Sequence, residues 1–421
     1  MVGCSFTATA AVPPTLPEES TTLPRLQRLG YPCDWQQPAD REGLVQTIRA
    51  ARAEGLALVP AGSGSRLDWG GLLSRPAIAL SVRRLNHLID HAAGDLTVTA
   101  EAGMTLAELQ QHLARENQFL PIDPLYAGRT TVGGLIATAH AGSLRHRYGS
   151  LRDLLLGIEI LRWDGEAAKA GGRVVKNVAG YDLMKLYHGS FGTLGLITEV
   201  TLRVYPLPEV CRTVAIAAPV TELGELRRRI ADSRLGPIAF DLISAGLAVS
   251  LGLSGPQLLV RFGGVEAAVV HQTEQLLALA GADRCRVIAA DPGFWSQEIV
   301  QPLEADGDGQ APLVRLALLP SQLPGLLEQL PASASARLHA GSGVGYIRLA
   351  PNTPVADLEQ WRRFCNQHQG YLTLLEGPTT LKQAFEVWGY DGSALPRMRA
   401  IRDRFDPQRL FSPGRFLPGL D

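Results

Sequence analysis

The sequence has few cysteines and no cluster of them. Its 5 cysteines are scattered among 421 residues, and no two form a Cys-x-x-Cys pair. This spacing argues against a disulfide framework and against a cysteine-ligated metal cluster, and it favours a reducing, cytoplasmic location. The longest apolar runs, such as residues 154–161, are much shorter than the roughly 18 residues of a membrane span. No transmembrane segment is therefore predicted.

The chain also lacks an excess of charge of either sign. It has 40 lysines and arginines against 41 aspartates and glutamates, a formal net charge of −1. Without a basic surface, binding to nucleic acid is not expected. Charged residues make up only 19% of the chain and hydrophobic residues 46%, which is typical of a large folded protein.

The order of predicted elements divides the chain into four segments. Residues 1–35 are expected to form an N-terminal tail, and residues 36–208 alternate between helical and strand-like stretches. In this segment Thr105 and Glu108 form a predicted capping box at a helix start. Residues 209–395 repeat the alternation as a compact second domain, and residues 396–421 begin with a basic helix before Pro407 and Pro413 end regular structure. The fold class expected is α+β.

Three loops rich in small residues are separated by predicted strands, and the first of them directly follows one. They are PAGSGSRL at residues 60–67, TTVGGLIATAHAG at 130–142 and GSFGTLGLIT at 189–198. Glycines let the backbone approach a ligand closely, and successive amides can bind an anion such as a diphosphate. Each loop could instead be an ordinary turn or a site of close helix–sheet packing. Together, three such loops indicate one extended ligand resembling a nucleotide.

A nicotinamide dinucleotide fits these loops poorly. The first loop reads only G-x-G-x-x-L, and no acidic residue follows near the offset of roughly 20 residues that a Rossmann unit needs. Tyr181 and Lys185 have the Tyr-x-x-x-Lys spacing of short-chain dehydrogenases, but this spacing is common by chance.

The three loops together resemble the FAD-binding domain of the vanillyl-alcohol oxidase and p-cresol methylhydroxylase flavoproteins. The run GGRVVKNVAGYDLMKLYHGSFGTLGLITEV, with DLLLGIEIL before it and FDPQRLFSPGRF at the end, narrows the resemblance to the FAD-binding subunits of bacterial glycolate oxidases, also called glycolate dehydrogenases. The resemblance implies a two-part FAD-binding domain of the p-cresol methylhydroxylase type over residues 36–208. It further implies an α+β cap domain over 209–395 and a C-terminal segment, 396–421, that returns to the FAD domain.

The resemblance also assigns residues to the cofactor. Ser65 stands where relatives with covalent flavin have a histidine, so FAD is expected to bind without a covalent bond. Arg415, or Lys176, is a candidate cation for the negative charge of the reduced ring. The residues expected to bind FAD are Ala61, Gly62, Ser63, Gly64, Ser65, Asp123, Pro124, Thr130, Thr131, Gly133, Gly134, Ala137, Thr138, Gly142, Gly192, Thr193, Gly195, Ile197 and Arg415.

Residues for substrate chemistry are less clearly marked. The stretch LHAGSGVGYIRL carries the catalytic candidates His339, Tyr346 and Arg348, of which the last two would share one face of a strand. They could equally be a polar strand edge. Trp388 and Tyr390 are further candidates. No metal site is predicted.

Two functions remain open at this point. The first is a flavoenzyme that oxidises a small 2-hydroxy acid, glycolate or D-lactate, and passes electrons to an acceptor other than oxygen. The second is a non-catalytic, flavin-carrying subunit that relays electrons or supports assembly of the same complex. The resemblance implies a catalytic flavoprotein subunit and an iron–sulfur subunit as partners, through which any contact with a membrane would be made.

Overall fold

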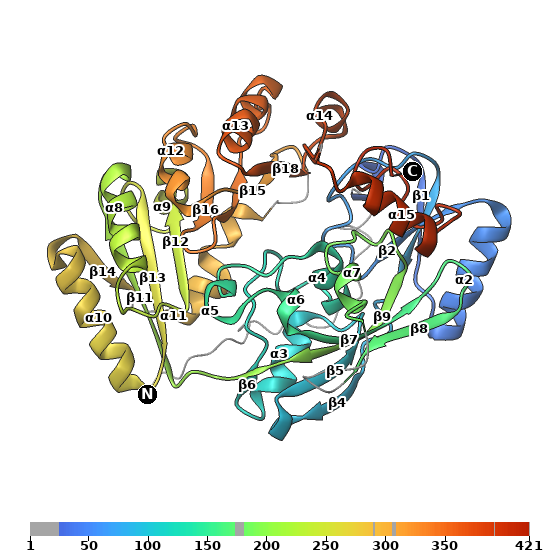
Figure 1. The fold of residues 1–421 in the computed structure, drawn as a ribbon, viewed down its shortest axis with the longest axis horizontal. Coiled ribbons are helices and arrows are strands. Elements are labelled where there is room, and N and C mark those ends of the chain that lie inside the picture. Colours follow the sequence, from blue (N-terminus) through green and yellow to red (C-terminus); the bar gives the residue numbers. More distant parts are fainter. Residues whose placement is uncertain (1–24, 173–180, 289–290, 305–308, 391, 421) are drawn as a thin grey trace.

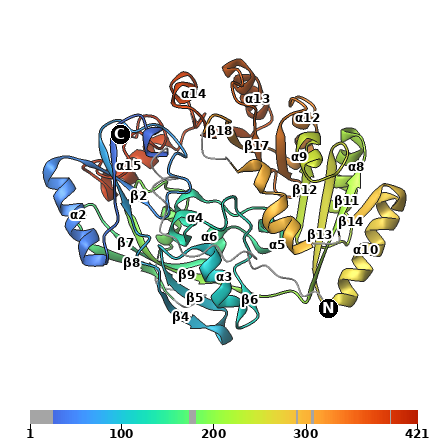
Figure 2. The same ribbon diagram turned by 180° about the vertical axis from the view of Figure 1, so that it is seen from behind.

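Two lobes that meet along one face make up the protein, seen here as a computed structural model (Figures 1 and 2). The structure describes residues 25–172, 181–288, 291–304, 309–390 and 392–420. Within these ranges, no helix combines the length and the apolar character that a membrane span requires. The α+β class predicted from the sequence is confirmed.

The first lobe contains a parallel sheet with the order β1-β3-β2 and an antiparallel sheet with the order β4-β5-β9-β7-β8. A short antiparallel pair, β6 and β10, lies beside them. The strands are β1 (Cys33–Gln36), β2 (Ala57–Ala61), β3 (Ala77–Ser81), β4 (Leu88–Ala92), β5 (Thr97–Glu101), β6 (Gln118–Phe119), β7 (Leu155–Leu161), β8 (Ala167–Gly171), β9 (Leu196–Arg203) and β10 (Tyr205–Pro206).

Local sequence signals set the ends of two helices in this lobe. The Asp40 side chain accepts a hydrogen bond from the Gly43 amide where α2 begins, and Gly55 ends that helix at a φ of 70°, which is favourable for glycine. Thr105 and Glu108 form the predicted capping box at α3. The helices are α2 (Arg41–Glu54), α3 (Leu106–Ala114), α4 (Val132–Thr138), α5 (Arg145–Tyr148), α6 (Leu151–Leu154), α7 (Met184–Tyr187) and α15 (Leu395–Phe405).

The second lobe is built on an antiparallel sheet with the order β14-β11-β13-β12-β16-β17-β15-β18. Its strands are β11 (Val210–Ala217), β12 (Ala239–Ile243), β13 (Gln257–Gly264), β14 (Cys285–Ile288), β15 (Leu313–Ala317), β16 (Ser335–His339), β17 (Val344–Arg348) and β18 (Tyr371–Glu376). Its helices are α8 (Val220–Ala231), α9 (Ala245–Ser250), α10 (Glu266–Ala280), α11 (Asp291–Gly293), α12 (Leu323–Leu327), α13 (Val355–Gln367) and α14 (Thr379–Ala384).

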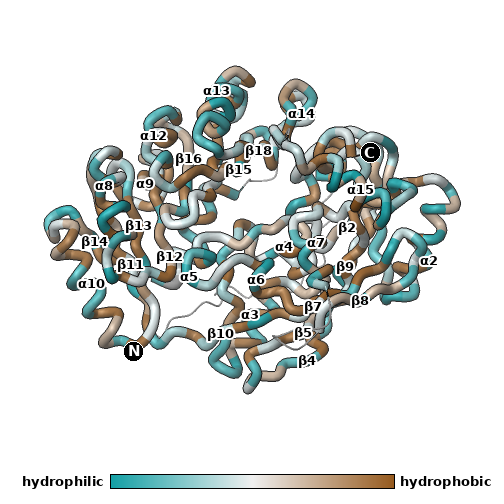
Figure 3. The backbone as a smooth tube through the Cα atoms, in the orientation of Figure 1, coloured by the Kyte–Doolittle hydropathy of each residue, from teal (hydrophilic) through white to brown (hydrophobic). Residues whose placement is uncertain are grey.

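The two faces of this large sheet have different partners. Helices α8, α10, α12 and α13 share one hydrophobic core with one face of the sheet. The opposite face contributes Tyr346 and Leu375 to another core, which also contains Trp69, Tyr126 and Leu144 of the first lobe. Hydrophobic residues follow the strands in both lobes (Figure 3). The second face is therefore where the lobes join.

A buried carboxylate lies at this junction. Glu376, at the end of β18, is 1% exposed and accepts hydrogen bonds from Trp69 Nε1 at 2.6 Å and the Tyr126 hydroxyl at 2.9 Å. Arg348 of β17 forms an ion pair with it at 2.8 Å. Since Trp69 and Tyr126 belong to the first lobe and Arg348 to the second, one carboxylate ties the lobes together.

The C-terminal segment returns to the first lobe. The Leu58 amide of β2 donates to Leu410 O at 2.7 Å, and the Ser412 amide donates to Leu58 O at 2.7 Å. The Gly71 amide donates to Arg415 O at 2.9 Å. This pairing brings Arg415 to the loop that follows β2.

Replacing Glu376 with alanine should destabilise the protein. The change leaves Arg348 as a buried cation without its carboxylate, and such losses are typically about 3–5 kcal/mol. We expect a lower urea midpoint, measured by circular dichroism. The matched control is Glu359→Ala, because Glu359 pairs with Arg363 at 3.8 Å on the surface and its loss should change stability by less than about 1 kcal/mol. Equal, small effects in both variants would contradict the role assigned to Glu376.

Candidate FAD site

The loop after β2 leaves its backbone amides available to a ligand. The chain turns at Gly64, where φ is 76°. A Cβ on Gly62 would lie 2.0 Å from Thr131 Oγ1, so only glycine fits at this position. In the part of the chain that the structure describes, the amides of residues 62–65 donate no hydrogen bond. Converging free amides of this kind form an anion-binding concavity.

Hydroxyl groups hold this loop against the start of α4. The Ser63 hydroxyl donates to Arg129 O, and Ser65 Oγ lies 3.3 Å from Thr130 Oγ1. Thr131 precedes α4 and accepts a hydrogen bond from the Gly134 amide at 3.3 Å. Because these side chains are short, the two loops lie close together and form the walls of one pocket.

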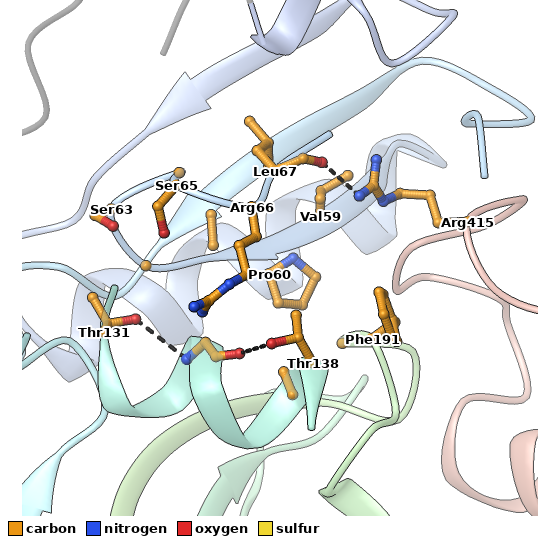
Figure 4. Close-up of a pocket in the computed structure, with 16 residues that line it drawn as sticks. Val59, Pro60, Ser63, Ser65, Arg66, Leu67, Thr131, Thr138, Phe191 and Arg415 are labelled. Atoms are coloured by element: carbon orange, nitrogen blue, oxygen red, sulfur yellow. Dashed lines mark hydrogen bonds between the residues drawn. The ribbon is translucent and has the colours of Figure 1, made fainter. Parts of the chain in front are cut away.

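The third glycine-rich loop closes the pocket. Gly192 has a φ of 68°, and a Cβ there would lie 3.1 Å from the ring of Pro60. Its neighbour Phe191 packs edge-on against Trp388, with ring centroids 4.6 Å apart. The predicted FAD-binding residues that line this pocket are Ala61, Gly62, Ser63, Gly64, Ser65, Thr131, Gly134, Ala137, Thr138, Gly192 and Arg415 (Figure 4).

The other predicted FAD-binding residues lie outside the lining of this pocket. Among them, the Asp123 carboxylate accepts from the Leu144 amide at 2.8 Å and pairs with Arg337 at 2.7 Å. Thr130 contacts Ser65 from behind the loop. Gly133 packs on Ala102, Gly142 on Asp123 and Gly195 on Leu161, while Pro124, Thr193 and Ile197 are buried.

Two buried guanidinium groups reach the pocket, and sequence reasoning found only one of them. Arg415 Nη2 donates to Leu67 O and Trp69 O, each at 2.5 Å. Arg66 Nη2 donates to Leu125 O at 2.5 Å, and its guanidinium lies 5.0 Å from the centre of the Trp69 ring. Among the described residues, Nη1 of both arginines and Nε of Arg66 have no hydrogen-bond partner. Burial lowers the pKa of each arginine to about 10.

A tyrosine–histidine pair joins the two lobes beside the pocket. The Leu125 amide donates to His140 Nε2 at 2.8 Å, so Nδ1 carries the imidazole proton. His140 Nδ1 lies 2.7 Å from the Tyr346 hydroxyl oxygen and therefore donates to it. Burial, with Arg66 and Arg315 nearby, holds the pKa of His140 well below its usual value. The proton of the Tyr346 hydroxyl is thus left for another acceptor.

His339 presents the complementary group. Its Nδ1 lies 2.9 Å from Asp241 Oδ1, and Asp241 also pairs with Arg337 at 2.7 Å. Burial works to raise the pKa of Asp241, but Arg337 and His339 outweigh it and keep that pKa low. A charged Asp241 keeps a proton on Nδ1, so in the neutral imidazole of His339 Nε2 is the acceptor. Within the described residues Nε2 has no partner, and the His339 and Tyr346 rings are 6.1 Å apart.

The remaining catalytic candidates have other environments. Arg348 shares a face of β17 with Tyr346, as predicted, but its donors are directed to Glu376, Leu303 O and Ala311 O. Trp388 packs on Phe191, and Tyr390 is 38% exposed. Tyr181 is 89% exposed, which removes the short-chain dehydrogenase pair from any buried site. Lys176 lies outside the described residues.

Arg315 of β15 is a site residue that sequence reasoning missed. It lies opposite Tyr346 in the sheet register, and its Nε has no partner among the described residues. Together with Arg66 it surrounds the Tyr346–His140 pair with positive charge. The described residues contain no group of histidine, cysteine, aspartate and glutamate side chains arranged to hold a metal ion.

A protein-family model described as an FAD binding domain matches residues 36–171. This stretch contains the first two loops and the strands from β2 to β8, while β9 lies outside it. Residues 36–171 are an FAD binding domain. The third loop and Arg415, which complete its pocket, come from outside the matched stretch.

Curated relatives of the chain are by name dehydrogenases and a subunit of an oxidase. D-2-hydroxyglutarate dehydrogenase of Xanthomonas citri is 34% identical over 182 residues, 43% of this chain and 39% of that protein. Glycolate oxidase subunit GlcE of Escherichia coli is 34% identical over 200 residues, 46% of this chain and 55% of that protein. The match therefore spans only about half of these relatives or less. D-lactate dehydrogenase [cytochrome] of Arabidopsis thaliana is 27% identical over 417 residues, 90% of this chain and 72% of that protein.

A solved structure shows the same fold over both lobes. Alkyldihydroxyacetonephosphate synthase matches with a TM-score of 0.66 and 15% identity, covering 91% of this chain and 77% of that one. The sequence prediction of an FAD domain with an α+β cap is confirmed by this match and by the family model.

The residues of the pocket fit FAD. Its diphosphate needs several hydrogen-bond donors, which the amides of residues 62–65 and Nη1 of Arg66 and Arg415 can supply. The glycines at 62, 134 and 192 let Thr131 and Pro60 pack closely against the loops that carry these donors. The FAD domain thus has donors for the anionic part of the cofactor.

Gly62→Ala should weaken FAD binding. The added Cβ must push Thr131 or the loop away, because 2.0 Å is far inside van der Waals contact. We expect a lower FAD content after purification and a weaker affinity by fluorescence titration. The control is Gly94→Ala, since no atom lies within 4 Å of a Cβ at Gly94. Unchanged FAD affinity in Gly62→Ala would contradict this packing.

Stability should fall as the pH drops from about 6.5 to about 4. Burial, with Arg315 and Arg152 nearby, lowers the pKa of His188 from 6.5 to about 4. Unfolded chains bind a proton at His188 in this window and folded chains do not, so the stability present above about pH 6.5 is lost as the pH falls through 4. Urea midpoints measured from pH 4 to 7 should show a smaller slope in His188→Gln. An unchanged slope would contradict this assignment.

Proposed function

We propose that this protein is an FAD-dependent oxidoreductase that oxidises a small 2-hydroxy acid, glycolate or D-lactate. The observation that carries the proposal is that a proton donor with no acceptor and a proton acceptor with no donor among the described residues lie on the face of the cap sheet that meets the FAD domain. The donor is the Tyr346 hydroxyl and the acceptor is His339 Nε2. Oxidation of an alcohol needs both: one group to hold the oxygen and one to take its proton.

The chain's residues would act on the substrate as follows. His339 Nε2 accepts the proton of the substrate hydroxyl, while Asp241 keeps the imidazole in the required tautomer. The Tyr346 hydroxyl donates a hydrogen bond to a substrate oxygen, and His140 fixes the direction of that donation. Arg315, which faces this group and has no carboxylate partner among the described residues, attracts the substrate carboxylate. When bound without a covalent link, FAD supplies the two-electron acceptor.

The charge balance around these groups supports an anionic substrate. Arg66 and Arg315 both lower the pKa of His140, and Arg315 lowers that of His188, each in addition to burial. Such a site attracts anions and disfavours further protonation of its histidines. A neutral alcohol would leave Arg315 without a countercharge among the described residues.

A second function is favoured by one relative. Escherichia coli GlcE is by name a subunit of glycolate oxidase, and this chain would then be one subunit of a larger hydroxy acid dehydrogenase, with a catalytic flavoprotein subunit and an iron–sulfur subunit as partners. In that role its own flavin would relay electrons or support assembly. Such a protein belongs in the cytoplasm, and any membrane contact would come from its partners.

An anaerobic absorbance titration separates the two functions. The purified, FAD-loaded chain receives glycolate and then D-lactate, and the oxidised flavin band is followed. Bleaching by either acid supports a competent dehydrogenase. A band that persists, but bleaches after the missing subunits are added, supports the subunit role.

Tyr346→Phe should slow flavin bleaching by a factor of about 10²–10⁴, the usual contribution of a positioned acid or base group. FAD content should be unchanged, because Tyr346 does not line the pocket of the glycine-rich loops. The matched control is Tyr31→Phe, whose side chain is 46% exposed. Equal bleaching rates in wild type and Tyr346→Phe would refute the role of this hydroxyl.

A further inference from the structure

Arg66 is a buried cation whose donors are mostly unpaired within the described part of the chain. Its side chain is 8% exposed, and its guanidinium points into the pocket between the first loop and α4 (Figure 4). Among the described residues only its Nη2 is bonded, to Leu125 O at 2.5 Å, and no salt bridge connects Arg66 to a described carboxylate. A buried cation without a counterion is strongly unfavourable unless a ligand supplies the charge.

The lining of the pocket identifies the kind of anion. Arg66 shares it with the free amides of residues 62–65, with Thr131 and with Arg415. Hydroxyls, converging amides and guanidinium groups together are the donor set of a phosphate site. Tyr346 and His339 do not line this pocket, so the pocket offers Arg66 an anion other than the substrate carboxylate placed beside them.

We propose that Arg66 is a side-chain anchor for the diphosphate of FAD and that, with Arg415, it supplies the countercharge of that group. A diphosphate linking two nucleosides carries about two negative charges, and two guanidinium groups balance them. In the first loop the amides alone would leave this charge unneutralised. The proposal rests on FAD as the cofactor and does not depend on which acid, if any, the protein oxidises.

Binding of cofactor fragments tests the proposal. Isothermal titration calorimetry on FAD-depleted protein compares FAD, ADP and riboflavin, because ADP retains the diphosphate without the ring and riboflavin retains the ring without the phosphates. In Arg66→Met we expect FAD and ADP to bind at least about tenfold more weakly, the usual effect of a lost charge-assisted hydrogen bond. Riboflavin affinity should stay the same. Arg66→Lys should recover part of the loss.

The matched control is Arg129→Met, which removes the same charge near the loop from an exposed side chain that does not line the pocket. It should bind all three ligands like the wild type. Rising KCl concentration should weaken ADP binding more steeply in wild type than in Arg66→Met. Thermal unfolding followed by circular dichroism confirms that each variant is folded, and Arg66→Gln replaces Arg66→Met if the latter is not.

Two results would overturn the proposal. Unchanged FAD and ADP affinity in the Arg66 variants would show that the arginine does not meet the diphosphate. A loss of riboflavin affinity equal to that of FAD, with ADP unaffected, would place the guanidinium against the flavin ring instead. Neither result depends on turnover: a protein that binds FAD through Arg66 but oxidises no hydroxy acid would contradict only the proposed activity.

Discussion

The structure depends on one buried carboxylate, Glu376, that accepts hydrogen bonds from both lobes. Trp69 and Tyr126 reach it from the FAD lobe and Arg348 from the cap sheet. A charge so buried is tolerated only when its partners are all present, so the lobes are held in one relative position. That position sets the face of β17 against the FAD lobe and brings Tyr346 to His140. Arg348 therefore fixes the lobes relative to each other, with its donors directed to Glu376, Leu303 O and Ala311 O.

The buried positive charge around the loop after β2 is the second constraint on the structure. Asp68, in the loop region after β2, pairs with Arg25 at 2.6 Å and Arg28 at 2.9 Å, and Lys382 donates to the neighbouring Gly70 O at 2.8 Å. Burial works to raise the pKa of Asp68, but Arg25, Lys382 and Arg28 outweigh it and hold that pKa near 2. The local acid is thus already neutralised, and Arg66 and Arg415 have charge to offer a bound phosphate. A region this rich in buried cations is organised for anions.

Short-range signals in the sequence were sufficient for the cofactor loops and the helix ends. The Gly/Ser loop after β2, the Thr-rich loop before α4 and the capping box at Thr105 each depend on neighbours within a few residues. The hydrogen-bond partners of the site residues, by contrast, are distant in the sequence. His140 lies inside one of the loops singled out, but its hydrogen-bond partner Tyr346 is 206 residues away. From strand alternation alone, Tyr346 and Arg348 were equivalent, and only the position of β18 directs Arg348 to Glu376.

Arg66 connects the two functional parts of the molecule. Its guanidinium lies over Trp69, whose ring packs edge-on against His140 with centroids 5.3 Å apart, and His140 donates to Tyr346. The charge of Arg66 helps to hold the pKa of His140 low. An anion bound to Arg66 would weaken that field at His140, since opposite charges close together screen each other at a distance. The cofactor pocket and the tyrosine–histidine pair are therefore electrostatically coupled through Arg66. An anion bound in the pocket changes the free energy of protonating His140.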